Sequence, residues 1–426
     1  MPVSTSPAPE TAPAAPAAPP PAPDPQESVR FALTLGRALH RFGTPAHRLE
    51  EVMTVVCAQL GLEARFVATP TAIFASFGPP EAQQATFIRG EPGTTNLHRL
   101  AHIDEIANAV LDGSTTPSDG ASLVEAQLIE APPGALDRLA RVACFALSAA
   151  AAAQLYGGGV KELAVSGALG LLLGLLEAAS TRVPTLERGF EPIAAFAASA
   201  ASVALTRAVG HFSTEVTTLS SLVYLLPGLA LTLAMMELST RNLISGTARF
   251  SGALTVFLLL GFGVALGRRV DVVLPPAPAS VPLVPLPAWT IVPALLVLTL
   301  ALAVLFRARR KDYSWILLAA VVAYAGGRIG AAWLGPELGA FVGALALGVA
   351  SNAYGRLLKR PTIITTVPGI MVLVPGSVGY RSVESMLAQD VVGGLATLFS
   401  MIFVLVGMAA GLVLAGSFVT PRRIQL

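Results

Sequence analysis

The sequence predicts a mostly α-helical polytopic membrane protein. We expect about ten transmembrane helices in two inverted repeats, preceded by a small α+β cytoplasmic domain. Hydrophobic residues make up 54% of the chain and charged residues only 13%, which is far from the composition of a soluble domain. In addition, two apolar runs that lie about 148 residues apart share one pattern around a Pro-Gly pair, which indicates an internal repeat.

The N-terminal part predicts a tail and one soluble domain. Residues 1–27 are rich in Pro and Ala, carry no signal-peptide pattern, and are expected to be disordered. Residues 28–135 are expected to form the α+β domain, with Ser28 capping its first helix. The expected elements are helices at 28–42, 46–60 and 96–111, strands at 63–68, 72–77 and 84–89, and a short element of uncertain type at 122–129.

Apolar runs dominate from Val142 onward, and a membrane helix needs about 20 such residues. The first membrane repeat is expected at 136–270, a Pro-rich linker at 271–287, and the second repeat at 288–426. The expected spans are 142–157, 160–178, 190–209, 216–236, 244–267, 288–306, 314–334, 337–354, 364–383 and 390–416.

The placement of Lys and Arg predicts the orientation in the cell membrane. If Arg138 and Arg141 precede the first span in the cytoplasm, every second loop is rich in basic residues, as is the C-terminus. The N-terminal domain and the C-terminus are therefore expected in the cytoplasm. An odd number of spans in each half gives the two halves opposite orientations, which makes the repeat one of inverted topology.

Pro-Gly pairs inside apolar spans predict broken membrane helices. The candidate breaks are Pro227-Gly228, Pro368-Gly369 and Pro375-Gly376, and the first and last of these occupy matching places in the two repeats. A broken helix offers backbone N–H and C=O groups to a substrate at membrane depth, as in secondary transporters. The alternative is a proline kink that only aids packing, because Pro and Gly are common in membrane helices.

Two groups of motifs resemble the threonine/serine exporter (ThrE) family. They are 36–39 (GRAL) and 43–51 (GTPAHRLEE) near the N-terminus, and 355–361 (GRLLKRP), 367–370 (VPGI) and 373–377 (LVPGS) in the second half. The resemblance covers almost everything after the tail. It implies export of threonine and serine from the cytoplasm, driven by the proton-motive force. The family also includes split two-protein versions linked to dicarboxylate export.

Hydroxyl groups near the breaks are candidates for binding a zwitterionic hydroxy amino acid. Their alternative role is a hydrogen bond to a carbonyl one turn earlier in the same helix. The expected substrate-binding residues are Thr217, Thr218, Ser221, Tyr224, Pro227, Gly228, Thr365, Thr366, Pro368, Gly369, Pro375, Gly376, Ser377 and Tyr380.

Few carboxylates lie near the breaks, and these are candidates for proton coupling. Glu237, Glu384 and Asp390 are the expected carriers, and Asn242 is the matching position to Asp390 in the first repeat. A carboxylate at membrane depth favours reversible protonation because an isolated charge is costly there. The alternative is that these residues are solvated in loops. Asp390 is the carrier that we would test first.

The expected function is a proton-coupled secondary transporter that exports small hydroxy amino acids. An exporter of succinate-like dicarboxylates is the alternative, and a membrane-bound hydrolase acting through the soluble domain is a further one. His98 and His102 have a spacing that can hold a metal, but a third ligand is not evident and no metal site is expected. No enzyme activity, cofactor or nucleic-acid partner is expected either. The expected partners are the transported substrate, protons and the lipid bilayer. Assembly as a homo-oligomer is left open.

Overall fold

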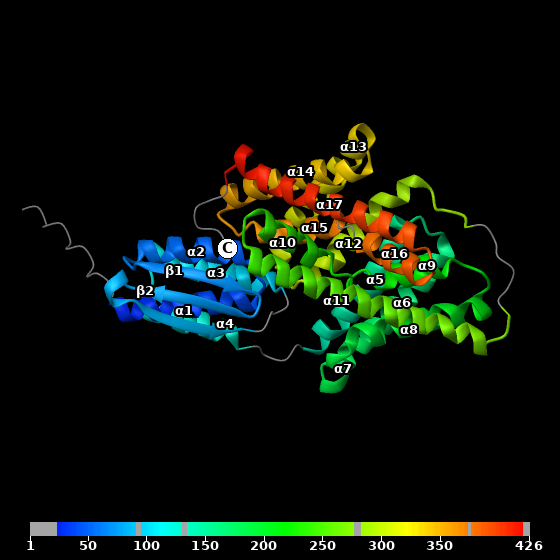
Figure 1. Cartoon of the computed structure of the whole chain (residues 1–426), viewed down its shortest axis with the longest axis horizontal. Coiled ribbons are helices and arrows are strands. Elements are labelled where there is room, and N and C mark those ends of the chain that lie inside the picture. Colours follow the sequence, from blue (N-terminus) through cyan, green and yellow to red (C-terminus); the bar gives the residue numbers. More distant parts are fainter. Residues whose placement is uncertain (1–23, 91–94, 130–133, 277–282, 374–375, 421–426) are drawn as a thin grey trace, which may run out of the picture.

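The computed structural model describes residues 24–90, 95–129, 134–276, 283–373 and 376–420. In this part of the chain, a domain with a small β-sheet lies at one end of a bundle of long helices (Figure 1). The mostly helical polytopic fold with an N-terminal α+β domain is confirmed.

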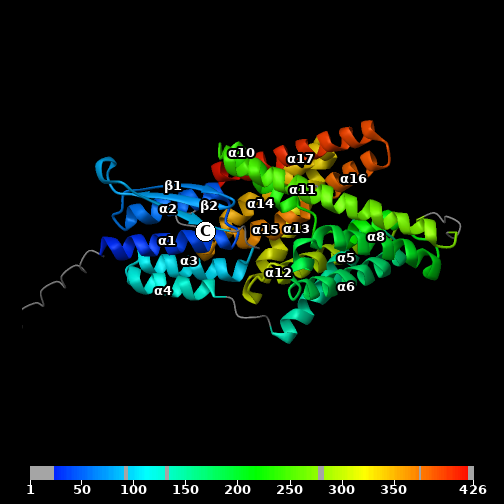
Figure 2. The ribbon, with the colours of Figure 1, turned by 60° about the horizontal axis from the view of Figure 1, so that its bottom comes forward.

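The soluble domain is built in layers. Its sheet is an antiparallel meander in the order β1-β2-β3, in which Val67 pairs with Phe74 and Phe74 with Phe87. The sheet lies on one side of α1 and α2, while α3 and α4 lie on the other side (Figure 2). The elements are α1 (Pro25–Arg41), α2 (Ala46–Gln59), β1 (Ala64–Thr69), β2 (Ala72–Phe77), a 3-10 turn (Pro80–Ala82), β3 (Gln84–Arg89), α3 (Leu97–Leu111) and α4 (Pro117–Leu128).

The three expected strands are confirmed, but two helix starts differ from the sequence expectation. Helix α1 begins at Pro25, because the Asp24 side chain accepts a hydrogen bond from the Gln26 N–H at 2.9 Å. The expected cap at Ser28 is wrong, since Ser28 is buried inside α1. The uncertain element at 122–129 belongs to α4, whose cap is Thr116.

The helix bundle contains eight helices that are long and apolar enough to cross a membrane, counted over the described residues. The other two expected spans are α5, whose first two turns carry charged side chains, and a span interrupted between α9 and α10. The helices are α5 (Ala135–Leu155), α6 (Val160–Ser180), α7 (Pro184–Arg188), α8 (Phe190–Val209), α9 (Thr214–Ser221), α10 (Gly228–Ser239), α11 (Leu243–Arg268), α12 (Ile291–Leu305), α13 (Tyr313–Leu334), α14 (Pro336–Leu358), α15 (Ile363–Leu373), α16 (Gly376–Leu387) and α17 (Val391–Phe418), with 3-10 turns at Arg269–Val273, Ala288–Thr290 and Arg310–Asp312.

The same close helix contact occurs in both halves of the bundle. A Cβ on Gly263 of α11 would lie 2.3 Å from the Pro192 carbonyl oxygen of α8. A Cβ on Gly411 of α17, which lies 148 positions later, would lie 2.5 Å from the Phe341 carbonyl oxygen of α14. Small residues let membrane helices approach closely. A glycine therefore allows the same close packing in both halves, between α8 and α11 in the first and between α14 and α17 in the second.

The matching segments α9–α10 and α15–α16 run in opposite directions relative to the soluble domain, since the first ends beside this domain and the second begins beside it. Glu237, near the end of α10, contacts this domain, whereas Ile363, at the start of α15, packs against its core. Figure 1 shows α11 leaving the soluble domain and α17 returning toward it.

Helix α3 joins the soluble domain to the end of α12. The backbone N–H groups of Leu97 and His98 donate to the carbonyls of Phe306 and Arg307, both at 3.0 Å. Each bond satisfies a donor at a helix N-terminus and an acceptor at a helix C-terminus, and the two helix dipoles meet head to tail. The soluble domain is thereby fixed to the second half of the bundle.

Candidate functional site

The first break lies at the centre of the bundle and is a true interruption. Helix α9 ends at Ser221, residues 222–227 are non-helical, and α10 begins at Gly228. The residue before α10 is Pro227, whose side chain forms no capping hydrogen bond. The first N–H groups of a helix have no partner within that helix. This end of α10 therefore presents free donors and the positive end of a helix dipole, which suit a carboxylate.

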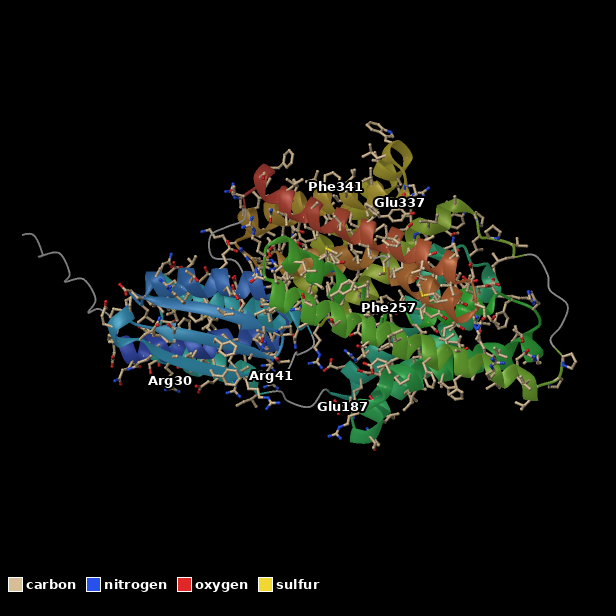
Figure 3. All side chains as sticks on the ribbon, viewed as in Figure 1. Arg30, Arg41, Glu187, Phe257, Glu337 and Phe341 are labelled. Atoms are coloured by element: carbon tan, nitrogen blue, oxygen red, sulfur yellow. The ribbon has the colours of Figure 1, made fainter. Side chains whose placement is uncertain are left out.

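Helices α15 and α16, which form the second span that the sequence predicts to be broken, both pack against this interruption. Leu222 and Leu226 share an apolar cluster with Tyr380 of α16. Phe257 of α11 belongs to the same cluster and lies in the middle of the bundle (Figure 3). Leu229, at the start of α10, packs against α15 in two neighbouring clusters. The structure thus brings together the two spans that the sequence repeat relates.

The predicted hydroxyl groups on α9 and α15 bond within the protein. The hydroxyls of Thr217 and Ser202 lie 2.7 Å apart, and the Thr365 hydroxyl lies 3.0 Å from that of Ser351. Thr217 and Thr365 occupy matching places in the two halves, and their bonds tie α9 and α15 to neighbouring helices. Hydrogen bonds of this kind hold membrane helices together.

Other predicted hydroxyls donate to backbone carbonyls, as the alternative reading described. The Ser221 hydroxyl donates to the Thr218 carbonyl at 2.7 Å, and that of Thr366 to the Thr362 carbonyl at 2.9 Å. Thr218 itself is buried. These hydroxyls have partners within their own helices.

The two predicted tyrosines differ in their surroundings. Tyr224 packs edge-on against Phe145, with the Arg141 guanidinium 5.9 Å from its ring centre. Tyr380 is 2% exposed, and its hydroxyl has no hydrogen-bond partner within the described residues. A buried hydroxyl without a partner costs free energy, so it is open to a polar group of a ligand.

The second and third candidate breaks have different outcomes. Pro368 and Gly369 lie inside α15, so a helix break at this pair is wrong. Gly369 instead provides space, since a Cβ there would lie 2.4 Å from the Leu347 side chain. Pro375 lies outside the described residues, between the end of α15 and the start of α16 at Gly376, and Ser377 lies in the first turn of α16.

Asp390 and Asn242 precede α17 and α11 at matching positions. Asp390 is exposed, and its carboxylate accepts a hydrogen bond from the Gly393 N–H at 3.0 Å, which caps α17. Asn242 is half-buried and forms no side-chain cap. The alternative of a solvated residue outside the span describes Asp390 well.

Glu384 lies on α16 in a network that joins the two halves. Its carboxylate pairs with Arg268 of α11, and its second oxygen is buried without a partner among the described residues. One turn away, Arg381 lies 3.5 Å from Glu215 of α9. Glu384 is 16% exposed on its side chain, so it is more enclosed than Asp390.

Glu237 joins the soluble domain to the first half of the bundle. Its fully buried carboxylate receives two hydrogen bonds from the Arg249 guanidinium and one from the Ala46 N–H at the start of α2, each at 2.9 Å. The Ser245 hydroxyl also donates to the Ala68 carbonyl of β1 at 3.0 Å. The sequence predicts Glu237 as a proton carrier and Arg249 as a basic loop residue, and the pairing of the two is found only in the structure.

His47 lies next to this junction, in the first turn of α2. Burial lowers the pKa of His47, and the positive charges of Arg48 and Arg249 lower it further. The carboxylates of Glu237 and Glu51 act in the opposite direction and raise this pKa, but they do not cancel the effect of burial. The Nδ1 of His47 is buried without a partner in the part of the chain that the structure describes. Protonation would place an additional buried donor beside Arg249.

We therefore expect acid to weaken the folded state through His47. A histidine whose pKa falls on folding binds its proton more readily in the unfolded chain. Neutral His47 therefore contributes fully to the free energy of unfolding above the unfolded pKa of about 6.5. As the pH falls below that value, this contribution is lost at no more than about 1.4 kcal/mol per pH unit. Thermal unfolding between about pH 8 and 5.5 should show a shallower decline for His47→Gln than for the wild type. Equal slopes would contradict this role.

His98 and His102 on α3 lie ring to ring, with centres 4.8 Å apart. His102 also lies 3.4 Å from Glu105, which pairs with Arg309 at the bundle. Over the described ranges, no three His, Cys, Asp or Glu side chains are placed to hold a metal ion.

Comparison with known families gives two matches in chain order. The ThrE model, described as a threonine/serine exporter, matches residues 30–270, and a second model, "Threonine/Serine exporter, ThrE", matches residues 292–418. Together they cover the soluble domain and both halves of the bundle.

The chain is also similar to several fungal proteins named "Pheromone-regulated membrane protein 10". The protein of Debaryomyces hansenii is 24% identical over 92% of this chain and 42% of its own length. That of Candida albicans is 27% identical over 83% of this chain and 33% of its own length. The protein of Saccharomyces cerevisiae is 26% identical over 92% of this chain and 54% of its own length. The chain thus spans between a third and about half of the length of these relatives. No solved structure matches the chain.

Proposed function

Because the chain belongs to the threonine/serine exporter (ThrE) family, we propose that it exports small hydroxy amino acids such as threonine and serine from the cytoplasm. The family is one of membrane exporters, and the helix bundle is that of a multi-pass membrane protein. The observation that carries the proposal is the uncapped start of α10 in the middle of the bundle, packed against α15 and α16.

The substrate carboxylate binds at the start of α10. The free N–H groups of Gly228 and the next two residues point along the helix axis toward the interruption, and the helix dipole adds a partial positive charge. The carbonyls at the end of α9 lie across the same interruption and suit the substrate ammonium group. The buried Tyr380 hydroxyl, whose residue belongs to the apolar cluster at this interruption, is the candidate for binding the side-chain hydroxyl of threonine or serine.

The two halves form inverted repeats around this site, with the soluble domain and both termini in the cytoplasm of the cell. The opposite directions of the matching segments α9–α10 and α15–α16 support this topology, as do the repeated contacts of Gly263 and Gly411. The basic residues near the soluble domain, Arg249 and Arg309 among them, agree with the positive-inside rule.

Proton antiport drives export, and Glu384 is the proposed proton carrier. It is enclosed, paired with Arg268 of the other half, and holds one unpartnered buried oxygen. Protonation would release Arg268 and separate α16 from α11, which links proton binding to movement of the halves. Glu237 is committed to the soluble domain, and Asp390 is an exposed helix cap, so both are weaker candidates.

Counterflow in proteoliposomes tests this function. Purified protein should exchange labelled threonine and serine, and an imposed pH gradient should drive their accumulation. We expect Glu384→Gln to keep exchange but lose accumulation, while Asp390→Asn keeps both. Exchange of labelled succinate without exchange of threonine or serine would contradict the proposal and favour a dicarboxylate exporter.

A further inference from the structure

A small cavity lies between the soluble domain and the first half of the bundle, away from the proposed transport site. It is enclosed by the end of α1, the loop before α2, the turn between β1 and β2, and α11. Its interior volume is about 30 Å³, and it is lined by His40, Thr44, Ala46, Thr69, Pro70 and Arg249, with Gly43 at its edge. One water molecule needs about 10–15 Å³ on this measure, so the cavity has room for about two oxygen-sized groups.

Two polar groups at this cavity lack partners. Thr44 is only 5% exposed, and its hydroxyl forms no hydrogen bond within the described residues. Arg249 uses Nε and Nη2 on Glu237, and its Nη1 has no acceptor among the described residues. A buried hydroxyl without a partner is costly, so Thr44 gains from a ligand that accepts a hydrogen bond. The Arg249 side chain is 20% exposed, and its remaining nitrogen can donate to the same ligand.

The lining is rich in donors. His40 Nε2 lies 2.8 Å from the Thr69 carbonyl and acts as a donor there, which occupies that carbonyl. The Ala46 N–H donates to Glu237 at the cavity wall, where the start of α2 adds a partial positive charge. The ligand is therefore an acceptor, and an anionic one, because Arg249 offers a charged donor.

Size and charge select a carboxylate among small anions. Two oxygens fill the available space, whereas phosphate brings four. The neighbouring Glu237 carboxylate is fully buried and would repel a doubly charged anion more than a singly charged one. Glu237 also shares the charge of Arg249, so the affinity should be modest, in the millimolar range of abundant metabolites.

We propose that this cavity binds the carboxylate of a small cytoplasmic metabolite and that the bound carboxylate strengthens docking of the soluble domain. One carboxylate oxygen accepts from Thr44 of the soluble domain and the other from Arg249 of α11. The ligand thus adds a link between the two parts, next to the existing link through Glu237. This regulatory site goes beyond the proposed export function and does not depend on the transported substrate.

Ligand-observed NMR with acetate on the full-length protein in nanodiscs tests the site directly. We expect millimolar binding to the wild type and about tenfold or more weaker binding to Thr44→Val, which keeps the size and removes the hydroxyl. Thr54→Val, on the exposed side of α2, is the matched control and should bind as the wild type does. Equal acetate affinity in wild type and Thr44→Val would overturn the proposal, as would the absence of binding to the wild type.

Hydrogen exchange of the wild type gives a second test that needs no variant. At constant ionic strength, acetate should slow amide exchange at the start of α2 and near Arg249, relative to chloride. Unchanged exchange would overturn the effect on docking. Phosphate should not displace acetate, and displacement at equal concentration would overturn the selection for a carboxylate.

Competition with L-threonine identifies the source of the carboxylate. If L-threonine displaces acetate from the wild type, the result supports the proposed site and identifies the exported amino acid as its natural ligand. If acetate binds but L-threonine does not displace it, the result supports the proposed site with another metabolic acid as the natural ligand. Because none of these measurements involves transport, failure of the export proposal leaves them interpretable.

Discussion

Replacing Arg249 by alanine should weaken docking of the soluble domain by about 3–5 kcal/mol, the usual cost of removing one partner of a buried ion pair. Glu237 is fully buried and would keep only the bond from the Ala46 N–H. Hydrogen exchange at the start of α2 reports the free energy of this opening directly, because the Ala46 amide is protected by Glu237 itself.

A double substitution separates loss of the pair from loss of packing. Replacing Glu237 and Arg249 together by methionine leaves no buried charge and should recover most of the loss, since apolar replacements of buried ion pairs are often nearly neutral. Arg182→Ala changes an exposed arginine and should stay within about 0.5 kcal/mol of the wild type. A cost below about 1 kcal/mol for Arg249→Ala would show that the pair does not hold the domain.

The junction around Glu237 shows where sequence reasoning stops. Long apolar runs predicted the membrane spans, and alternating or β-branched and aromatic residues predicted the strands, because both patterns are local. Ala46 and Glu237 are separated by 191 positions, and the bond between them depends on how two domains dock. Arg249, the first charged residue after Asn242, was the available signal, since a charge in an otherwise apolar helix needs a partner.

The Pro-Gly pairs show a second limit on what the sequence can predict about the structure. The sequence contains three similar Pro-Gly pairs, and the structure interrupts the helix at Pro227 but continues it through Pro368. A proline removes one hydrogen bond wherever it stands, but the surrounding helices decide whether the chain then unwinds. Next to Pro368, the missing Cβ of Gly369 lets the helix pack closely against Leu347 of α14.

The repeat was more informative than any single motif. An offset of 148 relates the Thr217 and Thr365 hydroxyls, and each proves to bond a serine on the neighbouring helix. The sequence found the positions but assigned them to the substrate, because a pattern of hydroxyls does not tell a ligand contact from a helix contact. The Tyr380 hydroxyl, which is buried without a partner among the described residues, could be distinguished from the bonded hydroxyls of Thr217 and Thr365 only in the structure.

Gly228→Leu should reduce threonine counterflow by about 100-fold or more while leaving the protein folded in the membrane. Gly228 is buried at the first position of α10, beside the free N–H groups that we assign to the substrate carboxylate. A leucine side chain there would cover these donors, and a misplacement of about 1 Å at such a site can cost about 100-fold in rate. Gly376→Leu, at the matching first position of α16, should act in the same direction.

The matched control is Gly252→Leu, which adds the same side chain to a membrane helix where no atom lies within 4 Å of the new Cβ. Its counterflow should remain close to that of the wild type, so any general effect of leucine on insertion or folding is measured separately. Equal protein per vesicle and equal unfolding temperatures make the rates comparable. If Gly228→Leu transports as fast as Gly252→Leu, the backbone at the start of α10 does not contact the substrate, and the binding site must lie elsewhere in the bundle.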